Sequence, residues 1–258
     1  MAGFKDVFQR IEVKYLLDDR QYTELRKRLE GMAAVDSYGQ TSILNIYFDT
    51  PDFKLIERSL EKPKYKEKLR LRTYGTAKDD SNAFIEIKKK YAGVVYKRRI
   101  SMPYADAIDY LVNGKEPKVK SQISNEIDYF LQYYKGIKPA MAISYDRIAM
   151  AGVTDPDLRI TFDTNIRWRT DKLSLKEGNV GKDILLPGQH LMELKIAGAM
   201  SIELAKILDE LNIRKTSFSK YGRGYLEYMY GQTNEMIMKG IVPNVKKDDN
   251  IALFRKAV

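Results

Sequence analysis

A row of basic residues at every second position is the feature of this sequence with the clearest chemical meaning. Lys66, Lys68, Arg70 and Arg72 alternate with mainly apolar residues. A period of two places them on one face of a β-strand. Like charges side by side repel, so a strand that keeps them is expected to face an anion. Because Arg presents a fork of donors and Lys a compact charge, both residue types suit such an anion.

Several other segments alternate in the same way, with charged or polar residues at every second position. They are Arg10, Glu12 and Lys14; Glu86 and Lys88; Lys97 and Arg99; Tyr145 and Arg147; Arg159, Thr161 and Asp163; and Glu193 and Lys195. Each segment predicts a strand with one charged face and one mainly apolar face. Arg98 falls on the opposite face from Lys97 and Arg99.

The overall composition agrees with an anionic partner. Lys and Arg number 45 against 35 Asp and Glu, a formal net charge of +10. This excess favours nucleic acid, an anionic membrane surface or a phosphorylated small molecule. The sequence has no cysteine, which excludes disulfides and thiolate metal sites. It also lacks a secretory signal and any apolar run near the roughly 20 residues of a spanning helix, so a cytoplasmic protein is expected.

The elements that must position these residues include several helices. Apolar residues at helical spacing predict helices over 19–32, 121–134, 201–211 and about 224–230, and Ser121 is a candidate cap. Residues 79–82 predict a turn between strands, and residues 171–182 predict an exposed loop. We expect a single domain over 1–258, with a core of about 9–230 and an extension over 231–258 whose weak periodicity predicts no structure.

Two architectures fit the charged and apolar strand faces. In one, an open sheet has its apolar face under the helices and its charged face in water. In the other, an antiparallel sheet closes into a barrel, the helices cover its outer apolar face, and the charged face lines the lumen. Composition favours the barrel, because a solvated face normally mixes Lys and Glu with Thr, Ser and Gln. The row from Lys66 to Arg72 instead stacks like charges.

The order of the motifs along the chain resembles a known family. The motifs are Arg10-x-Glu12-x-Lys14-Tyr15, Tyr47-Phe48-Asp49-Thr50-Pro51-Asp52, Lys68-x-Arg70-x-Arg72, Glu86-x-Lys88, Tyr145-x-Arg147, Arg159-x-Thr161-x-Asp163, Glu193-x-Lys195 and Ser219-Lys220-Tyr221. Together they resemble the VTC domain of the vacuolar transporter chaperone complex and its bacterial relatives, within the triphosphate tunnel metalloenzyme superfamily. The resemblance spans roughly residues 9–225 and suggests a bacterial-type, stand-alone member.

The resemblance implies a fold and a reaction. The fold is α+β, an antiparallel tunnel barrel with a basic lumen and helices packed outside, and VTC members make polyphosphate from ATP. The implied catalytic residues are Lys14, Arg70, Arg72, Lys88, Arg147, Arg159 and Lys220. The implied substrate-binding residues are Arg10, Lys68, Lys97, Arg99, Tyr145, Lys195 and Ser219.

A divalent metal is implied by the same resemblance. Glu193 would hold Mn²⁺ or Mg²⁺, whereas Glu12 and Glu86 would either ligate the metal or orient basic residues. A carboxylate is a suitable hard ligand for these ions. Phosphoryl transfer relies mainly on positioning and charge stabilisation, so no histidine base is required, and His190 is interpreted as structural or surface.

The sequence departs from the family patterns at two positions. Arg10 replaces the first Glu of the wider superfamily's Glu-x-Glu-x-Lys, as it does in VTC members. Ser217 stands where the VTC pattern has Lys. Two further interpretations are structural: residues 47–51 are expected to serve packing at a strand end, and Asp163 is expected to anchor Arg159 or Arg167, with a direct metal role as the alternative.

Three functions remain open from the sequence. The first is an ATP-dependent polyphosphate polymerase with ATP, pyrophosphate and polyphosphate as partners. The second is a triphosphatase on the same fold, which the few lumen glutamates disfavour. The third is a non-catalytic binder of polyphosphate or nucleic acid, and nucleic acid is disfavoured because the basic rows carry few aromatics for stacking. Membrane association is expected only through other chains, and the oligomeric state is not predicted.

Overall fold

The computed structural model describes residues 10–238. The strands are β1 (Arg10–Asp18), β2 (Ala33–Asp49), β3 (Tyr65–Tyr74), β4 (Asn82–Tyr91), β5 (Val94–Pro103), β6 (Lys138–Gly152), β7 (Arg159–Arg169), β8 (Lys182–Asp183), β9 (Gln189–Ala197) and β10 (Lys215–Thr216). The helices are α1 (Asp19–Arg28), α2 (Lys54–Leu60), α3 (Tyr104–Leu111), α4 (Gln122–Tyr133), α5 (Ile202–Glu210) and α6 (Lys220–Met238), with the 3-10 turn η1 (Leu175–Glu177).

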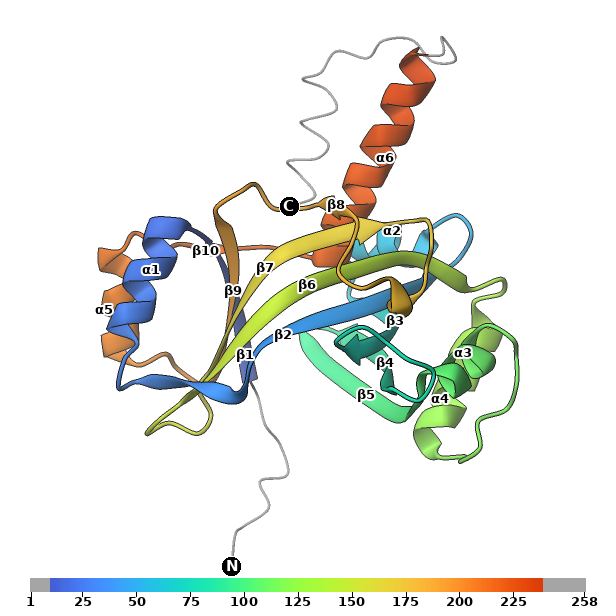
Figure 1. Cartoon of the computed structure of the whole chain (residues 1–258), viewed down its shortest axis with the longest axis horizontal. Coiled ribbons are helices and arrows are strands. Elements are labelled where there is room, and N and C mark those ends of the chain that lie inside the picture. Colours follow the sequence, from blue (N-terminus) through green and yellow to red (C-terminus); the bar gives the residue numbers. More distant parts are fainter. Residues whose placement is uncertain (1–9, 239–258) are drawn as a thin grey trace, which may run out of the picture. The chain divides into compact units, whose positions relative to one another are not determined.

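The strands form one ten-stranded sheet, which confirms the α+β class (Figure 1). The hydrogen-bonded order is β10-β1-β9-β7-β6-β2-β3-β4-β5, and β8 pairs with β7. The pairs with a described register are antiparallel. Within residues 10–238 the order ends at β10 on one side and at β5 on the other. Barrel closure therefore stays a prediction.

The chain divides into two compact units made of separate segments. Among the described residues, unit 1 comprises 10–41, 146–165 and 185–218, and unit 2 comprises 42–145, 166–184 and 219–238. Three of the boundaries fall inside β2, β6 and β7, and the other two fall just after β8 and just before α6. The single domain expected from the sequence stays a prediction.

Unit 1 buries an apolar core beneath two helices. α1 contacts β1, β9 and α5 (Figure 1). Leu25 of α1 and Leu204 of α5 lie in the core with Phe162 and Leu194 of the strands. Asp18 caps α1 by accepting from the backbone of Gln21, whose side chain in turn accepts from the backbone N–H of Asp18. This capping box satisfies amide groups that the first turn leaves unpaired.

Unit 2 buries the apolar faces of β3 and β4 against helices. Leu69, Leu71, Ile85 and Ile87 are fully buried and lie in one core with residues of α3 and α4. Because the alternate positions on these strands are the basic rows, the predicted separation of apolar and charged faces is confirmed here. Glu67 is an exception on the apolar face: it is buried and accepts hydrogen bonds from the hydroxyls of Tyr65 and Tyr134.

The helix predictions were largely confirmed. α1, α4 and α5 occupy the expected segments, and Ser121 caps α4 as predicted. α6 is longer than the predicted 224–230, and residues 239–258 of the predicted extension lie outside the described residues. The short helices α2 and α3 were not predicted. The exposed loop predicted over 171–182 is largely exposed, but it includes η1, whose Leu175 is buried in the core of unit 2.

Asp49 organises the start of α2 at the end of β2. The residue at the helix N-cap, Phe53, has a φ of 57° and provides no side-chain cap. The buried carboxylate of Asp49 instead accepts from the backbone N–H of Leu55 at 2.9 Å and of Ile56 at 3.1 Å. It also accepts from the hydroxyl of Tyr221 of α6 at 2.8 Å. One carboxylate therefore ties β2, α2 and α6 together.

We expect Asp49→Asn to lower the free energy of unfolding by about 1–3 kcal/mol, because an amide cannot accept all of these hydrogen bonds and one buried donor is left unpaired. Urea unfolding at neutral pH would measure the change. The control is Asp52→Asn, which alters an exposed pair with Lys54 and should change stability by less than about 1 kcal/mol. Equal effects of the two substitutions would contradict the role given to Asp49.

Candidate functional site

The basic row of β3 lies in the middle of a charged sheet face in unit 2. Its register places Arg70 between Tyr47 of β2 and Glu86 of β4, and Lys68 opposite Lys88. β5 continues the rows with Arg99 opposite Glu86 and Lys97 opposite Lys88. Residues directly opposite each other have Cβ atoms roughly 5 Å apart. Within β3, β4 and β5, Glu86 is the only carboxylate on this face, whose cations are Lys66, Lys68, Arg70, Arg72, Lys88, Lys90, Lys97 and Arg99.

Glu86 is the centre to which the cations of this face converge. Its side chain is 1% exposed. The Nε of Arg70 donates to it at 2.7 Å, and the Nζ of Lys97 lies 2.6 Å from its other oxygen. Arg72 lies 3.8 Å away. Burial would raise the pKa of Glu86, but Arg70, Arg72 and Lys97 outweigh it and lower the pKa to about 2. These contacts favour the orienting role over metal binding for Glu86.

Hydrogen bonds to neighbouring side chains hold the guanidinium of Arg72 in place. Its Nε donates to the side chain of Asn45 at 2.8 Å, and its Nη2 donates to the hydroxyl of Tyr145 at 3.3 Å. Asn45 is fixed in turn by the carbonyl of Ile143. Arg72 is therefore a preorganised positive charge, of the kind that stabilises charge without reorganisation.

Tyr47 belongs to the same face, although residues 47–51 were expected to serve packing. Its hydroxyl accepts a hydrogen bond from Nη1 of Arg70 at 3.0 Å. Its ring stacks on Tyr221 with the centroids 4.4 Å apart. The available signal was the alternation in β2, which places Asn45, Tyr47 and Asp49 on one side of the strand.

The N-terminus of α6 adds the predicted Ser219 and Lys220. The hydroxyl of Ser219 accepts from the backbone N–H of Gly222 at 3.1 Å and lies 3.4 Å from Nζ of Lys68. Nζ of Lys220 lies 4.6 Å from the centroid of the Tyr145 ring. A helix N-terminus with adjacent lysines is a favourable environment for an anion.

Two predicted residues lie toward the outer part of this face. The guanidinium of Arg99 lies 4.9 Å from the centroid of the Phe84 ring, and Lys88 is exposed. Both share the face of Arg70 by register. The structure therefore brings together the predicted residues of unit 2, namely Lys68, Arg70, Arg72, Glu86, Lys88, Lys97, Arg99, Tyr145, Ser219 and Lys220.

Unit 1 carries a second cluster in which carboxylates and cations alternate. Nζ of Lys14 donates to the carbonyl of Phe218 at 2.9 Å and lies 3.6 Å from both Glu12 and Glu193. Arg147 also approaches Glu193, with Nη2 at 3.3 Å. Glu193 is thus flanked by two cations.

Asp163 pairs with a different partner from the one expected. It is fully buried and accepts two hydrogen bonds from Arg147, at 2.6 and 2.7 Å. The expectation that Asp163 anchors Arg159 or Arg167 was therefore wrong. Arg147 lies on the neighbouring strand in the sheet order, and its planar fork matches the carboxylate with two parallel bonds.

The remaining predicted residues of unit 1 are more exposed. Arg159 donates to Asp36 at 3.2 Å, and Lys195, opposite Arg159 in the register, lies 3.9 Å from Glu12. Arg10 pairs with Ala197 through the backbone, but its side chain lies outside the described residues. His190 stacks on Tyr22 and contacts Asp19, which agrees with a structural role.

The carboxylates of unit 1 are suited to a divalent metal only if an anion binds together with it. No cluster of three or more potential metal-ligating side chains of Asp, Glu, His or Cys occurs within residues 10–238. Glu193 is the best single ligand, but Lys14 and Arg147 would repel a lone cation. Beside Glu193, the buried Thr161 lies directly opposite in the register, and its hydroxyl has no hydrogen-bond partner in the described structure. A metal that arrives with phosphate oxygens and waters would suit this environment.

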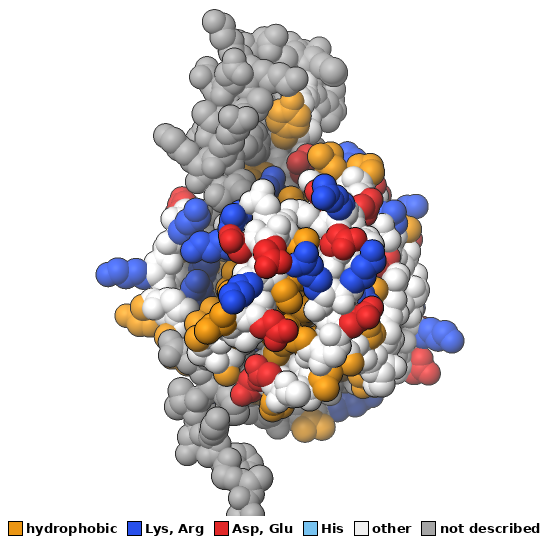
Figure 2. Space-filling view, turned by 90° about the vertical axis from the view of Figure 1, so that its left-hand side faces the viewer, with side chains coloured by type: hydrophobic (Ala, Val, Ile, Leu, Met, Phe, Trp, Pro, Cys, Tyr) orange, Lys and Arg blue, Asp and Glu red, His pale blue; other side chains and the backbone are white. Residues whose placement is uncertain are grey.

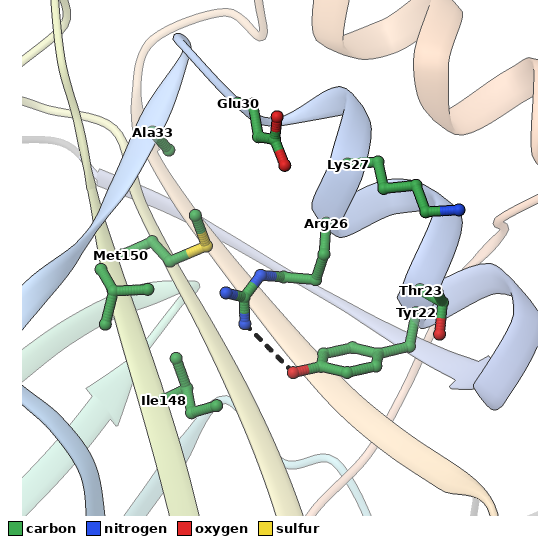
Figure 3. A pocket seen from close by; sticks show the side chains of 9 residues that line it. Tyr22, Thr23, Arg26, Lys27, Glu30, Ala33, Ile148 and Met150 are labelled. Atoms are coloured by element: carbon green, nitrogen blue, oxygen red, sulfur yellow. Dashed lines mark hydrogen bonds between the residues drawn. The ribbon is translucent and has the colours of Figure 1, made fainter.

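A separate cavity of about 630 Å³ opens between α1, β2 and β6 in unit 1. Tyr22 and Arg26 of α1 face Ile148 and Met150 across it, and Arg26 donates to the Tyr22 hydroxyl (Figure 3). None of the residues that line it is a predicted site residue. We therefore place the candidate site on the charged strand faces and not in this cavity.

Two solved structures have a similar fold. The fold is similar to that of a candidate adenylate cyclase from Bacillus halodurans, with a TM-score of 0.53 and 14% identity over 81% of this chain and 93% of that one. It is also similar to an adenylyl cyclase candidate from Hippeastrum for which a dominant triphosphatase activity is described, with a TM-score of 0.54 and 15% identity over 84% and 95% of the two chains. These similarities show the fold alone.

Residues 9–229 match the VTC domain, and the chain therefore belongs to the VTC domain family, within the triphosphate tunnel metalloenzyme superfamily. It is 25% identical over 208 residues to vacuolar transporter chaperone complex subunit 4 of Schizosaccharomyces pombe. The similarity covers 69% of this chain and 29% of that protein, so the chain spans under a third of the relative's length. Over residues 10–238 no helix is long and apolar enough to cross a membrane.

We expect the stability of the protein to fall between about pH 4.5 and pH 2 partly through Glu86. Its folded pKa is lowered from 4.5 to about 2, so its contribution is present above the unfolded pKa and is lost as pH falls through the folded pKa. This contribution is on the order of 3 kcal/mol. Glu86→Gln should lower the free energy of unfolding at pH 7 and flatten its acid dependence.

Urea unfolding at pH 7, 4 and 3 would measure both effects. The matched control is Glu126→Gln, because Glu126 lies on α4 and approaches Lys89 and Arg98 only at 3.7 and 3.9 Å. Glu126→Gln should keep the acid dependence of the unaltered protein. The same acid dependence in Glu86→Gln would show that Glu86 does not carry the effect.

Proposed function

We propose that this chain is an ATP-dependent, metal-assisted polyphosphate polymerase that transfers the terminal phosphoryl group of ATP to a polyphosphate chain. The observation that carries the proposal is the face of β3, β4 and β5, where one carboxylate, Glu86, stands among many cations. Membership of the VTC domain family supports it. Closure of the sheet into a tunnel is part of the proposal and rests on the superfamily.

The residues of unit 2 would bind and orient phosphate groups. Arg70 keeps N–H groups for an anion beyond those that contact Glu86 and Tyr47. Arg72 supplies a fixed charge, and Lys68 and Lys220 supply compact charges beside the N-terminus of α6. Such a preorganised array stabilises negative charge as it moves during transfer. The attacking and leaving oxygens therefore need positioning more than proton transfer by the protein.

The residues of unit 1 would bind a metal together with phosphate oxygens. Glu193 would hold Mn²⁺ or Mg²⁺, which when bound neutralises phosphate charge. Lys14 and Arg147 orient the carboxylate from either side. Glu12 lies 3.6 Å from Lys14, which supports an orienting role for it.

A triphosphatase remains the second candidate because of the likeness in fold to the Hippeastrum protein. Hydrolysis needs an activated water, and a carboxylate that could act on it should be unpaired, yet Glu86, Asp163 and Glu193 are each engaged by basic side chains. This arrangement favours transfer over hydrolysis.

Nucleic-acid binding gains no support from the face that carries α1 and α5. Acidic and basic side chains are interspersed there (Figure 2). They include the pairs of Arg28 with Glu210 and of Arg214 with Asp209. A phosphate backbone is normally met by a patch of one sign.

The decisive test is incubation with ATP and Mn²⁺, with and without pyrophosphate, followed by a gel that separates long polyphosphate from orthophosphate. We expect long chains, and Arg70→Ala should reduce their rate of formation roughly 10- to 100-fold, because a charge-assisted hydrogen bond is lost. Arg98→Ala is the matched control, since Arg98 lies on β5 but faces away from the basic rows, near Glu126.

The other results of this assay are equally informative. Orthophosphate as the sole product would reassign the chain to the triphosphatases. Binding of tripolyphosphate without turnover would indicate a non-catalytic polyphosphate-binding protein. Equal losses in Arg70→Ala and Arg98→Ala would remove the basic face from the reaction.

Glu193→Gln should weaken Mn²⁺ binding in the presence of tripolyphosphate roughly tenfold or more. Water-proton relaxation would report it, because the relaxation rate rises when Mn²⁺ is held on the slowly tumbling protein. Glu203→Gln, at an exposed position of α5, is the control and should bind as the unaltered protein does. Unchanged binding in Glu193→Gln would move the metal to other ligands.

A further inference from the structure

Tyr47 has an unused hydrogen-bond donor on the basic face of unit 2. Its hydroxyl oxygen accepts from Nη1 of Arg70 at 3.0 Å, so the phenol proton must point elsewhere. Within the part of the chain that the structure describes, the Tyr47 hydroxyl donates no hydrogen bond. A hydroxyl that takes one bond from an arginine and keeps its proton is arranged to donate to an anion that the arginine also binds.

The ring of Tyr47 is held so that the hydroxyl cannot readily turn away. It stacks on the ring of Tyr221 at 4.4 Å and 16°. The hydroxyl of Tyr221 donates to the buried carboxylate of Asp49, which also caps α2. Tyr47 itself is 8% exposed. Its position is thus fixed by packing on one side and by Arg70 on the other.

Arg70 is oriented toward the same ligand. Nε and Nη2 of Arg70 are fixed by Glu86 at 2.7 and 2.6 Å. Because the guanidinium is planar, these contacts and the Tyr47 hydroxyl set the direction of its remaining N–H groups. An anion bound by those groups would lie beside the Tyr47 oxygen.

We propose that the Tyr47 hydroxyl donates a hydrogen bond to a phosphate oxygen of the polyphosphate or triphosphate bound by Arg70. This inference rests on the proposed function, since it names a further contact of the same site. Tyr47 would be a binding residue for the reacting phosphate groups, one that the resemblance to the family did not include.

The charges around Tyr47 make the contact sensitive to pH. Burial raises the pKa of Tyr47, but Arg70, Lys68 and Arg72 outweigh it and lower the pKa to about 8. Above that pH the phenolate has no proton to donate and competes with phosphate for Arg70. A bound phosphate should in turn favour the neutral phenol. The cations that act on Tyr47 are Lys68, Arg70 and Arg72 of β3, and the ring of Tyr221 of α6 stacks on it. Glu86 of β4 and Tyr145 of β6 act on Arg70.

The test is the affinity for tripolyphosphate, measured by calorimetry from pH 7 to 9.5 in the unaltered protein and in Tyr47→Phe. Tyr47→Phe keeps the stacked ring and removes only the hydroxyl. We expect roughly tenfold weaker binding at pH 7. We also expect the affinity of the unaltered protein to fall above about pH 8 toward that of Tyr47→Phe, whose own affinity should change less over this range.

Ultraviolet absorbance of tyrosinate gives a second readout that does not depend on turnover. The unaltered protein should show a tyrosine that titrates near pH 8, absent from Tyr47→Phe and shifted upward by tripolyphosphate. Tyr129→Phe is the control, because Tyr129 is 64% exposed on α4 and should leave both measurements unchanged.

The failures are distinguishable. If the unaltered protein binds tripolyphosphate and Tyr47→Phe binds it equally at pH 7, the inference about Tyr47 is wrong while the proposed function stands. A tyrosinate titration that tripolyphosphate does not shift would also overturn it. If the unaltered protein binds no tripolyphosphate at any pH, both the inference and the proposed function are wrong.

Discussion

The interaction on which the basic face of unit 2 depends is the convergence of Arg70, Arg72 and Lys97 on the buried carboxylate of Glu86. A buried carboxylate alone would be costly, and so would closely spaced cations alone. Together they hold one another in place and still leave an excess of positive charge. A chain of phosphates can neutralise that excess. The interaction that allows this charged face to fold therefore also leaves it able to bind an anion.

Unit 1 achieves a different balance with the same residue types. Lys14 and Arg147 stand between carboxylates, with Asp163 held by two short bonds and Glu193 approached from both sides. A site with nearly balanced charge has little affinity for a lone anion or a lone cation. It suits a ligand that brings both charges together, as a metal–phosphate complex does.

Alternation along the sequence was enough to predict the two faces of β3 and β4, because residues at every second position of a strand lie on the same side. It could not predict which charged side chains pair with each other. Long side chains reach diagonal neighbours, so Lys97 meets Glu86 although Arg99 is the residue opposite it. Asp163 pairs with Arg147 on a neighbouring strand, and the sequence alone does not show which strands are neighbours.

Tyr47 and α2 were missed for a related reason. The role of Tyr47 arises from contacts with Arg70 and Tyr221, which lie far away in the sequence. Helix α2 is only seven residues long, which is too short for a clear helical periodicity. Its cap is Asp49 in the preceding strand and not a residue at its own N-terminus, so no local capping residue predicted it. Sheet closure depends on interactions at the ends of the strand order, and alternation carries no information about those ends.

The strand order in the described residues ends at β5, which carries Lys97, Arg98 and Arg99 in succession. An end strand with free backbone groups is a template on which a second copy of the chain can add by edge-to-edge pairing. Positive charges on both faces of β5 would meet the identical charges of an incoming β5 and repel it. The charges of β5 would thus also protect the nascent sheet from aggregation.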